Sequence, residues 1–229
     1  MNEFDELTIA EEREKTYRFL AGLCLKPPSD SLIEKIKDGS ILTLFQDDPG
    51  RKSYDEMARL VREASELENI SEELAAEHTS IFVLPSSHLP HEAVYLDREK
   101  RLGGRVTISV SQFYEKAGAD VLESCIEMPD HIGMELEFMA FLCKMEKEMQ
   151  GNADYTALKD CIQLQKMFLD EHLLKWVYQC CERIIERATY GFYKAIAYLI
   201  IEFMKSEEEY IAELYAETDA GYKMQDASN

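Results

Sequence analysis

The sequence predicts an all-α fold, a bundle of about nine to ten helices with an irregular loop near residues 85–108. All six prolines precede residue 130, and proline breaks a helix by removing a hydrogen bond and clashing with the preceding turn. Residues 130–229 contain none and are rich in Ala, Leu, Glu, Lys and Met, which favour helices. Apolar residues recur at helical spacing through most of the chain, and no pair of strands is evident.

The first helix is expected over residues 8–25, because its apolar side chains share one face and two prolines follow it. A short second helix begins at Ser31, which with Glu34 forms a capping box, and ends near Gly39. The amphipathic stretch 54–68 predicts a third helix. Ser71, followed by two glutamates, is expected to cap a fourth that runs to about Val83.

The middle of the chain lacks a helical period between residues 85 and 104. Residues 105–110 alternate apolar and polar, which suggests a strand. Because no second strand is evident to pair with it, we expect an extended loop there, followed by a short helix over residues 112–117.

About four helices are expected in the second half of the chain. Asp130 is the predicted N-cap of the first, which runs to about Met149 and is apolar over so wide an arc that it should be central in the core. The others are expected over residues 155–169, 171–188 and 191–216. We therefore predict one helical domain over residues 1–217 and a disordered tail over residues 218–229.

The charge balance restricts the partners. With 45 acidic and 25 basic residues, the net charge of −20 repels nucleic acid and anionic lipid and attracts cationic partners. The amino terminus is acidic and unlike a secretory signal, and the longest apolar stretch, around residues 195–203, is too short to cross a bilayer. We expect a cytoplasmic protein that binds no nucleic acid and does not insert stably into membranes.

The sequence lacks the signatures of the commonest enzymes. No nucleophile elbow, phosphate-binding loop, dinucleotide fingerprint or zinc-protease motif is present, so neither an enzyme nor a cofactor is expected. The six cysteines form no Cys-x-x-Cys pair, and a disulfide framework is not expected.

Two polar clusters have more than one interpretation. Asp130, His131 and Glu135 fit a helix cap with an i, i+4 surface pair, a metal pair, or the wall of a groove. His88 and His91 flank a proline, but zinc needs at least three rigid protein ligands, so no metal is predicted there.

The loop that follows Val83 is unusually apolar. Its large side chains either fold back on the core or form the floor of a groove that accepts an apolar partner segment. They are Leu84, Pro85, Leu89, Pro90, Val94, Tyr95 and Leu96.

Two blocks of the sequence resemble the TorD/DmsD family of cytoplasmic redox-enzyme maturation chaperones. The first family block, F-x-G-P followed by P-x-x-S-V-Y, is matched by Phe82, Pro85, Pro90, Val94 and Tyr95. The second, around D-H-x-x-x-E-L-x-F-M, is matched by Pro129, Asp130, His131, Glu135, Leu136, Phe138 and Met139. Phe168, His172, Leu173, Trp176 and Phe192-Tyr193 are similar to later helices of the family.

The resemblance implies an all-helical chaperone that binds the twin-arginine leader, the apo catalytic subunit of a molybdopterin oxidoreductase, or both. It holds the client for cofactor insertion before export, as a monomer or a segment-exchanged dimer. The peptide-binding residues expected from the apolar loop and the two blocks are Phe82, Leu84, Pro85, Pro90, His91, Val94, Tyr95, Leu96, Asp130, His131 and Glu135.

Three alternatives remain open from the sequence. One is a chaperone for a nitrate-reductase-like subunit that lacks a cleaved leader. A second is a helical metal-dependent hydrolase that uses His88, His91, His131 and Glu135. A third is a passive helical adaptor with no preference for twin-arginine leaders.

Overall fold

The computed structural model describes the chain apart from residues 1–2, 46–49, 65, 68, 85–89, 120–126 and 227–229. The side chains of residues 3–8 and 219–226 are also outside the description. Within the described residues the chain forms ten α-helices and no strand, which confirms the predicted all-α fold. The helices are α1 (Glu3–Leu25), α2 (Asp30–Lys37), α3 (Lys52–Glu63), α4 (Ile70–His78), α5 (Glu92–Leu96), α6 (Arg105–Lys116), α7 (Ile132–Gly151), α8 (Tyr155–Phe168), α9 (Leu174–Arg187) and α10 (Gly191–Asp226). A 3₁₀ segment, η1 (Ser40–Phe45), and two π-helical segments, η2 (Thr79–Val83) and η3 (Leu169–Leu173), adjoin them.

The contacts divide the chain into two compact units. The first contains Met1–Ala21, His91–Trp176 and Met204–Asn229, and the second contains Gly22–Pro90 and Val177–Phe203. The predicted single domain over residues 1–217, and the tail after it, stay predictions. The backbone of α10 is helical to Asp226.

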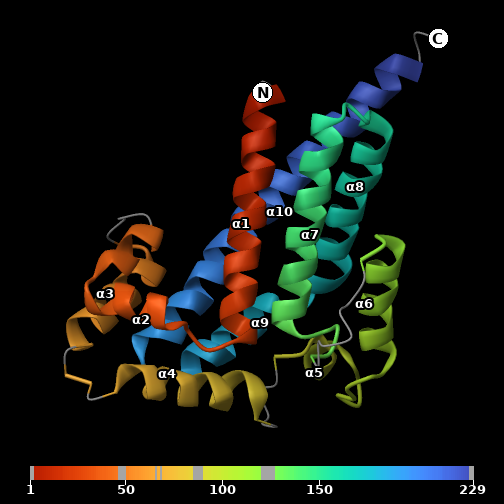
Figure 1. Ribbon diagram of the computed structural model, residues 1–229. Helices are drawn as coiled ribbons and strands as arrows, with labels where there is room; N and C mark the ends of the chain where they lie inside the picture. Colours follow the sequence, from red (N-terminus) through yellow and green to blue (C-terminus); the bar gives the residue numbers. More distant parts are fainter. Residues whose placement is uncertain are drawn as a thin grey trace. The chain divides into compact units, whose positions relative to one another are not determined.

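In the first unit, α1, α7, α8 and the later part of α10 run side by side (Figure 1). A buried ion network connects all four. The Arg13 guanidinium, from α1, donates to Glu146 of α7 at 2.7 Å, to Glu207 of α10 at 2.8 Å and to Gln165 of α8 at 2.7 Å. A buried arginine needs such partners because an unpaired charge in the core costs several kcal/mol, about 3–5 by analogy with broken buried pairs.

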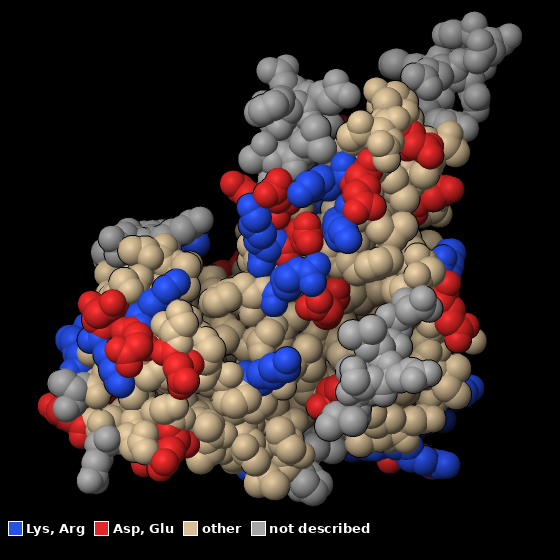
Figure 2. Space-filling model, viewed as in Figure 1, with Lys and Arg blue, Asp and Glu red and all other residues tan. Residues whose placement is uncertain are grey.

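The outer surfaces of α1 and α7 carry charges of both signs (Figure 2). Arg18 of α1 pairs with Glu14 on its own helix and with Glu137 of α7, and Lys147 of α7 pairs with Glu11 of α1. Such exposed pairs contribute at most about 1 kcal/mol each. The apolar faces beneath them therefore supply most of the packing energy.

In the second unit, the beginning of α10 packs closely against α3. A Cβ atom at Gly191 would lie 2.5 Å from the carbonyl oxygen of Glu56 and 3.2 Å from the Cβ of Leu60. Two residues later, the ring of Tyr193 packs against Phe82 and His78 at centroid separations of 5.6 and 6.0 Å. These contacts hold η2 and the end of α4 on α10.

Three local predictions were wrong. Residues 105–110 are the first half of α6, neither a strand nor an extended loop. The buried positions of α6, Thr107, Val110, Phe113 and Tyr114, recur at three to four residues, and Ile108 of the apparent alternation is 54% exposed. Ser29 and Asn69, instead of Ser31 and Ser71, cap α2 and α4 with their side chains. Both caps were therefore predicted two residues too late in the sequence, at the nearby serines.

Candidate functional site

The segment that begins at His91 is fixed to the start of α7. His91 and His131 form an isolated antiparallel bridge. The N–H of Glu92 donates to the carbonyl oxygen of Asp130 at 2.8 Å, and the N–H of Ala93 donates to Oδ2 of Asp130 at 3.1 Å. Asp130 thus holds the first turn of α5 with both its backbone and its side chain.

Asp130 is fully buried, yet it stays ionised. Burial alone raises the pKa of its carboxyl, but the interaction with His91 and the N–H of Ala93 outweigh burial and lower the pKa below its usual value. Nδ1 of His91 lies 3.8 Å from Oδ1 of Asp130. The carboxylate therefore stabilises α5 from inside the protein, and solvent does not reach it.

The predicted cap of α7 was wrong. His131 is the N-cap, and its Nδ1 accepts a hydrogen bond from the N–H of Gly133 at 3.0 Å. Asp130 cannot take that position because its carboxylate faces α5. His131 and Glu135 are both buried, so they do not form the surface pair that the spacing suggested, and Oε2 of Glu135 accepts the indole N–H of Trp176.

Behind this junction lies a cluster of buried polar side chains from α5, α7, η3 and α9. Nδ1 of His172 is 2.9 Å from Oε2 of Glu92, and Nε2 of His172 is 3.2 Å from the hydroxyl of Ser109. The indole N–H of Trp176 donates to Oε2 of Glu135 at 3.1 Å. Because every side chain here except Ser109 is buried, the cluster fixes α5 and α6 against α7 and the first turn of α9, all within the first unit.

Glu135 is the most perturbed acid of this cluster. Complete burial and then the nearby charge of Glu92 raise the pKa of Glu135 well above its usual value, although the bond from Trp176 opposes the shift. Burial therefore favours the protonated form of Glu135 more than in an ordinary glutamate, and the side chain acts as a packed hydrogen-bonding group.

The eleven predicted binding residues fall into different environments. Seven are buried, namely Phe82, Pro90, His91, Val94, Asp130, His131 and Glu135. Leu84 and Leu96 are 49% and 42% exposed, Tyr95 is half-buried, and Pro85 lies outside the described residues.

The structure brings together the residues of this set from His91 onward. Phe82, Leu84 and Pro90 belong to the second unit, so a groove that joins both sets stays a prediction. Among the described residues of the first unit, the large exposed hydrophobic side chains are Leu96, Leu102, Ile108 and Tyr155. Among those of the second unit they are Leu44, Val83 and Leu84.

Sequence reasoning missed the roles of Glu92, His172 and Trp176. Glu92 follows His91 directly, and His172 and Trp176 were noted only for their resemblance to later family helices. Their residue types could have identified them. A glutamate, a histidine and a lone tryptophan in apolar segments need hydrogen-bond partners if they are buried.

The described part of the chain holds no group of three or more His, Cys, Asp or Glu side chains that could bind a metal ion. His88 of the hydrolase alternative lies outside it. No helix in the described ranges is long and apolar enough to span a membrane.

Comparison with known proteins identifies the family. The family model described as nitrate reductase delta subunit matches residues 47–182, more than half of the chain. The chaperone protein TorD of Vibrio cholerae serotype O1 (strain ATCC 39315 / El Tor Inaba N16961) is 27% identical over 214 residues, which cover 91% of this chain and 96% of that protein. The chaperone protein TorD of Aliivibrio salmonicida (strain LFI1238) is 25% identical over 220 residues, which cover 93% and 99%.

The relatives align over about nine-tenths of the chain, and the region matched by the family model, residues 47–182, includes both blocks that carried the resemblance. The chain belongs to the nitrate reductase delta subunit family, as a non-enzymatic chaperone of the TorD/DmsD type for molybdoenzyme maturation.

Proposed function

We propose that this protein is a cytoplasmic chaperone that binds the twin-arginine leader of a molybdopterin oxidoreductase subunit, its apo-form, or both. It holds the client for cofactor insertion before export. The observation that carries the proposal is the likeness to TorD chaperones along more than nine-tenths of the chain. TorD-family chaperones bind molybdoenzyme subunits, and the client and its leader are the finer part of the proposal.

The leader's apolar run is proposed to bind exposed apolar side chains of the predicted set. Leu96 in the first unit and Leu84 in the second each expose more than two-fifths of their surface. Burying about four large apolar side chains contributes roughly 6–12 kcal/mol before association and ordering costs. Those costs remove several kcal/mol and leave an affinity on the order of micromolar.

The buried polar residues are proposed to position this surface. Asp130 and His131 hold α5, on which Tyr95 and Leu96 lie, through the backbone bridge and the bond to Ala93. The ring of Tyr95 also packs against Trp176 at a centroid separation of 5.3 Å. Substitution of Asp130 should therefore weaken leader binding by displacing α5, without removal of a direct contact.

The acidic surface accounts for the first encounter. A twin-arginine leader has a basic start, and the net charge of −20 attracts it over a distance that salt shortens. Exposed arginine–carboxylate pairs add only about 0–1 kcal/mol each. Charge therefore steers the leader, and apolar contact holds it.

A second candidate function is favoured by the description of the family model, which names a nitrate reductase subunit. In that case the client is a nitrate-reductase-like subunit without a cleaved leader, and the chaperone binds its mature part. The two candidates differ in which client fragment binds.

Co-purification from the native host tests the proposal. We expect a molybdoenzyme catalytic subunit to co-purify with the tagged chaperone, and its precursor to compete with a synthetic leader peptide. A mature subunit that binds equally well without its leader favours the second candidate. If no molybdoenzyme subunit co-purifies, the proposed function is wrong.

A further inference from the structure

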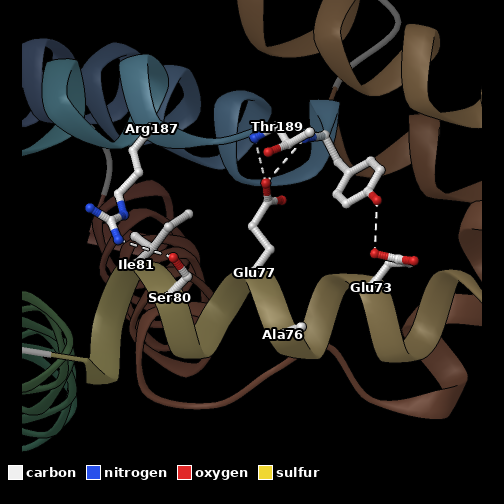
Figure 3. Close-up of a pocket in the computed structure, with 8 residues that line it drawn as sticks. Glu73, Ala76, Glu77, Ser80, Ile81, Arg187 and Thr189 are labelled. Carbon is white, nitrogen blue, oxygen red and sulfur yellow. Dashed lines mark hydrogen bonds between the residues drawn. The ribbon is translucent and has the colours of Figure 1, made fainter.

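A second feature of interest is a cavity of about 250 Å³ in the second unit, where α4 and η2 face the turn between α9 and α10. Glu73, Glu77 and Ser80 line one side, and Arg187, Thr189 and Tyr190 line the other (Figure 3). Pockets for drug-sized ligands are usually about 300–1,000 Å³. This cavity is therefore suited to a single side chain.

One oxygen of the Glu77 carboxylate has a structural role. Oε1 accepts hydrogen bonds from the N–H groups of Thr189 and Tyr190 at the start of α10 (Figure 3). A negative charge at this end of a helix is stabilising, because the first amides are unpaired and carry partial positive charge. The structural role of Glu77, to bind the start of α10, therefore needs only Oε1.

The other oxygen, Oε2, has no partner within the described residues, although Glu77 is only 8% exposed. Buried polar atoms are nearly always hydrogen-bonded, and an unsatisfied one costs about 1–3 kcal/mol. Burial also raises the pKa of Glu77, against the two backbone bonds and the charge of Lys194. A donor supplied from outside would remove this cost.

The remaining charged groups at the cavity define the sign of a ligand. Glu73 lies one turn before Glu77 on α4 and accepts the hydroxyl of Tyr190 at 2.8 Å. Arg187 donates to the hydroxyl of Ser80 at 3.1 Å. The lining thus contains two carboxylates and one arginine. The atom without a partner, Oε2 of Glu77, is a hydrogen-bond acceptor, so the ligand should be a donor with positive charge.

We propose that this cavity binds the guanidinium group of an arginine supplied by a partner polypeptide, with Oε2 of Glu77 as the main acceptor and Glu73 as the second. A guanidinium is planar, presents several N–H donors and is less strongly hydrated than an ammonium, so it enters a narrow cavity at lower desolvation cost. A bare metal ion is a poorer fit, since in the described residues no cluster has enough ligands. The site does not depend on the identity of the client.

The test is a titration with blocked arginine, N-acetyl-arginine methylamide, followed by ¹H–¹⁵N NMR of the full chain. The amides of Thr189 and Tyr190 report directly, because both donate to Glu77. The matched ligand control is blocked citrulline, which has nearly the same shape without the charge. The matched protein control is Glu72→Gln, because Glu72 is exposed on α4 and does not line the cavity.

We expect saturable shifts of both amides with blocked arginine and none with blocked citrulline. Glu77→Gln keeps an oxygen for the start of α10 but removes the charge, and should weaken binding at least fivefold, whereas Glu72→Gln should change it less than twofold. Arg187→Gln should strengthen binding, because it removes a cation from the wall. Equal responses to arginine and citrulline, or equal affinities of the Glu77 and Glu72 variants, would overturn the proposal. If Glu77→Gln does not fold, unchanged binding in both Glu73→Gln and Arg187→Gln would overturn it as well.

Discussion

Nδ1 of His172 lies 2.9 Å from Oε2 of Glu92, and both side chains are buried in the first unit. These residues are 80 positions apart in the sequence. The pair connects the short helix α5 to η3, the π-helical turn between α8 and α9. Helix α5 carries part of the proposed binding surface. The pair therefore helps to hold that surface in position on the core.

Removal of His172 should be destabilising. His172→Phe fits among Phe113 and Phe168, whose rings already pack on His172, but leaves the Glu92 carboxylate buried without its partner. We expect a loss of about 1–3 kcal/mol in the free energy of unfolding, measured in urea, because a buried carboxylate loses one hydrogen-bond partner. The double variant with Glu92→Gln should recover part of this loss, and a loss below about 1 kcal/mol in the single variant would contradict the assignment.

The acid at position 135 should make stability depend on pH. Its folded-state pKa lies well above the ordinary value of 4.5, so between these two values the folded protein binds more protons than the unfolded chain. This contribution is complete below about pH 4.5 and is lost as the pH rises towards the folded-state pKa. Glu135→Gln imitates the protonated acid and lacks this dependence.

The free energy of unfolding of the natural protein, relative to Glu135→Gln, should therefore increase as the pH is lowered towards about 4.5. Urea unfolding at several pH values, followed by the fluorescence of the only tryptophan, Trp176, measures it. Parallel pH profiles for the two proteins would show that Glu135 is not held in its neutral form.

The Arg13 network offers a comparison between a buried and an exposed arginine on one helix. Arg13→Ala leaves Glu146 and Glu207 buried without their cation and should cost about 3–5 kcal/mol. Arg18→Ala removes two exposed ion pairs and should cost at most about 1 kcal/mol. Thermal and urea unfolding of both variants provide the test, and equal losses would be inconsistent with the network.

Two glycines should respond in opposite directions to alanine. Gly191→Ala places a methyl group against the backbone of α3 and should cost about 1–3 kcal/mol. Gly22→Ala meets nothing within 4 Å inside α1 and should stabilise the protein by about 0.5–1 kcal/mol. Melting temperatures of the two variants check the close packing of α10 on α3, which a harmless Gly191→Ala would disprove.

Most helices could be predicted from the sequence, but the contacts between them could not. The distribution of proline and the spacing of apolar residues predicted most helices, because both depend on local geometry. The first half of helix α6 was missed because apolar residues at 106, 108 and 110 imitate a strand, while its buried face includes the polar residue Thr107. Thr107 is tolerated there because its hydroxyl accepts the N–H of Gly103.

The candidate site was predicted only in part for a similar reason. Asp130, His131 and Glu135 were singled out correctly as an unusual group, but their burial and their partners depend on residues far along the chain. Trp176 reaches Glu135 across 41 positions, and no local pattern encodes that contact. The same residues were therefore assigned to the wall of a groove, whereas the structure places them beneath the surface.

The most direct test of the account is calorimetric titration of the chaperone with its client's leader peptide at two salt concentrations. We predict that polar substitutions in the leader's apolar run, and Leu84→Asp or Leu96→Asp in the chaperone, weaken binding by tenfold or more. Arg→Lys changes in the leader and higher salt should have smaller effects. The reverse ranking, with Arg→Lys changes and salt dominant and the apolar substitutions neutral, would contradict the claim that an apolar surface holds the client.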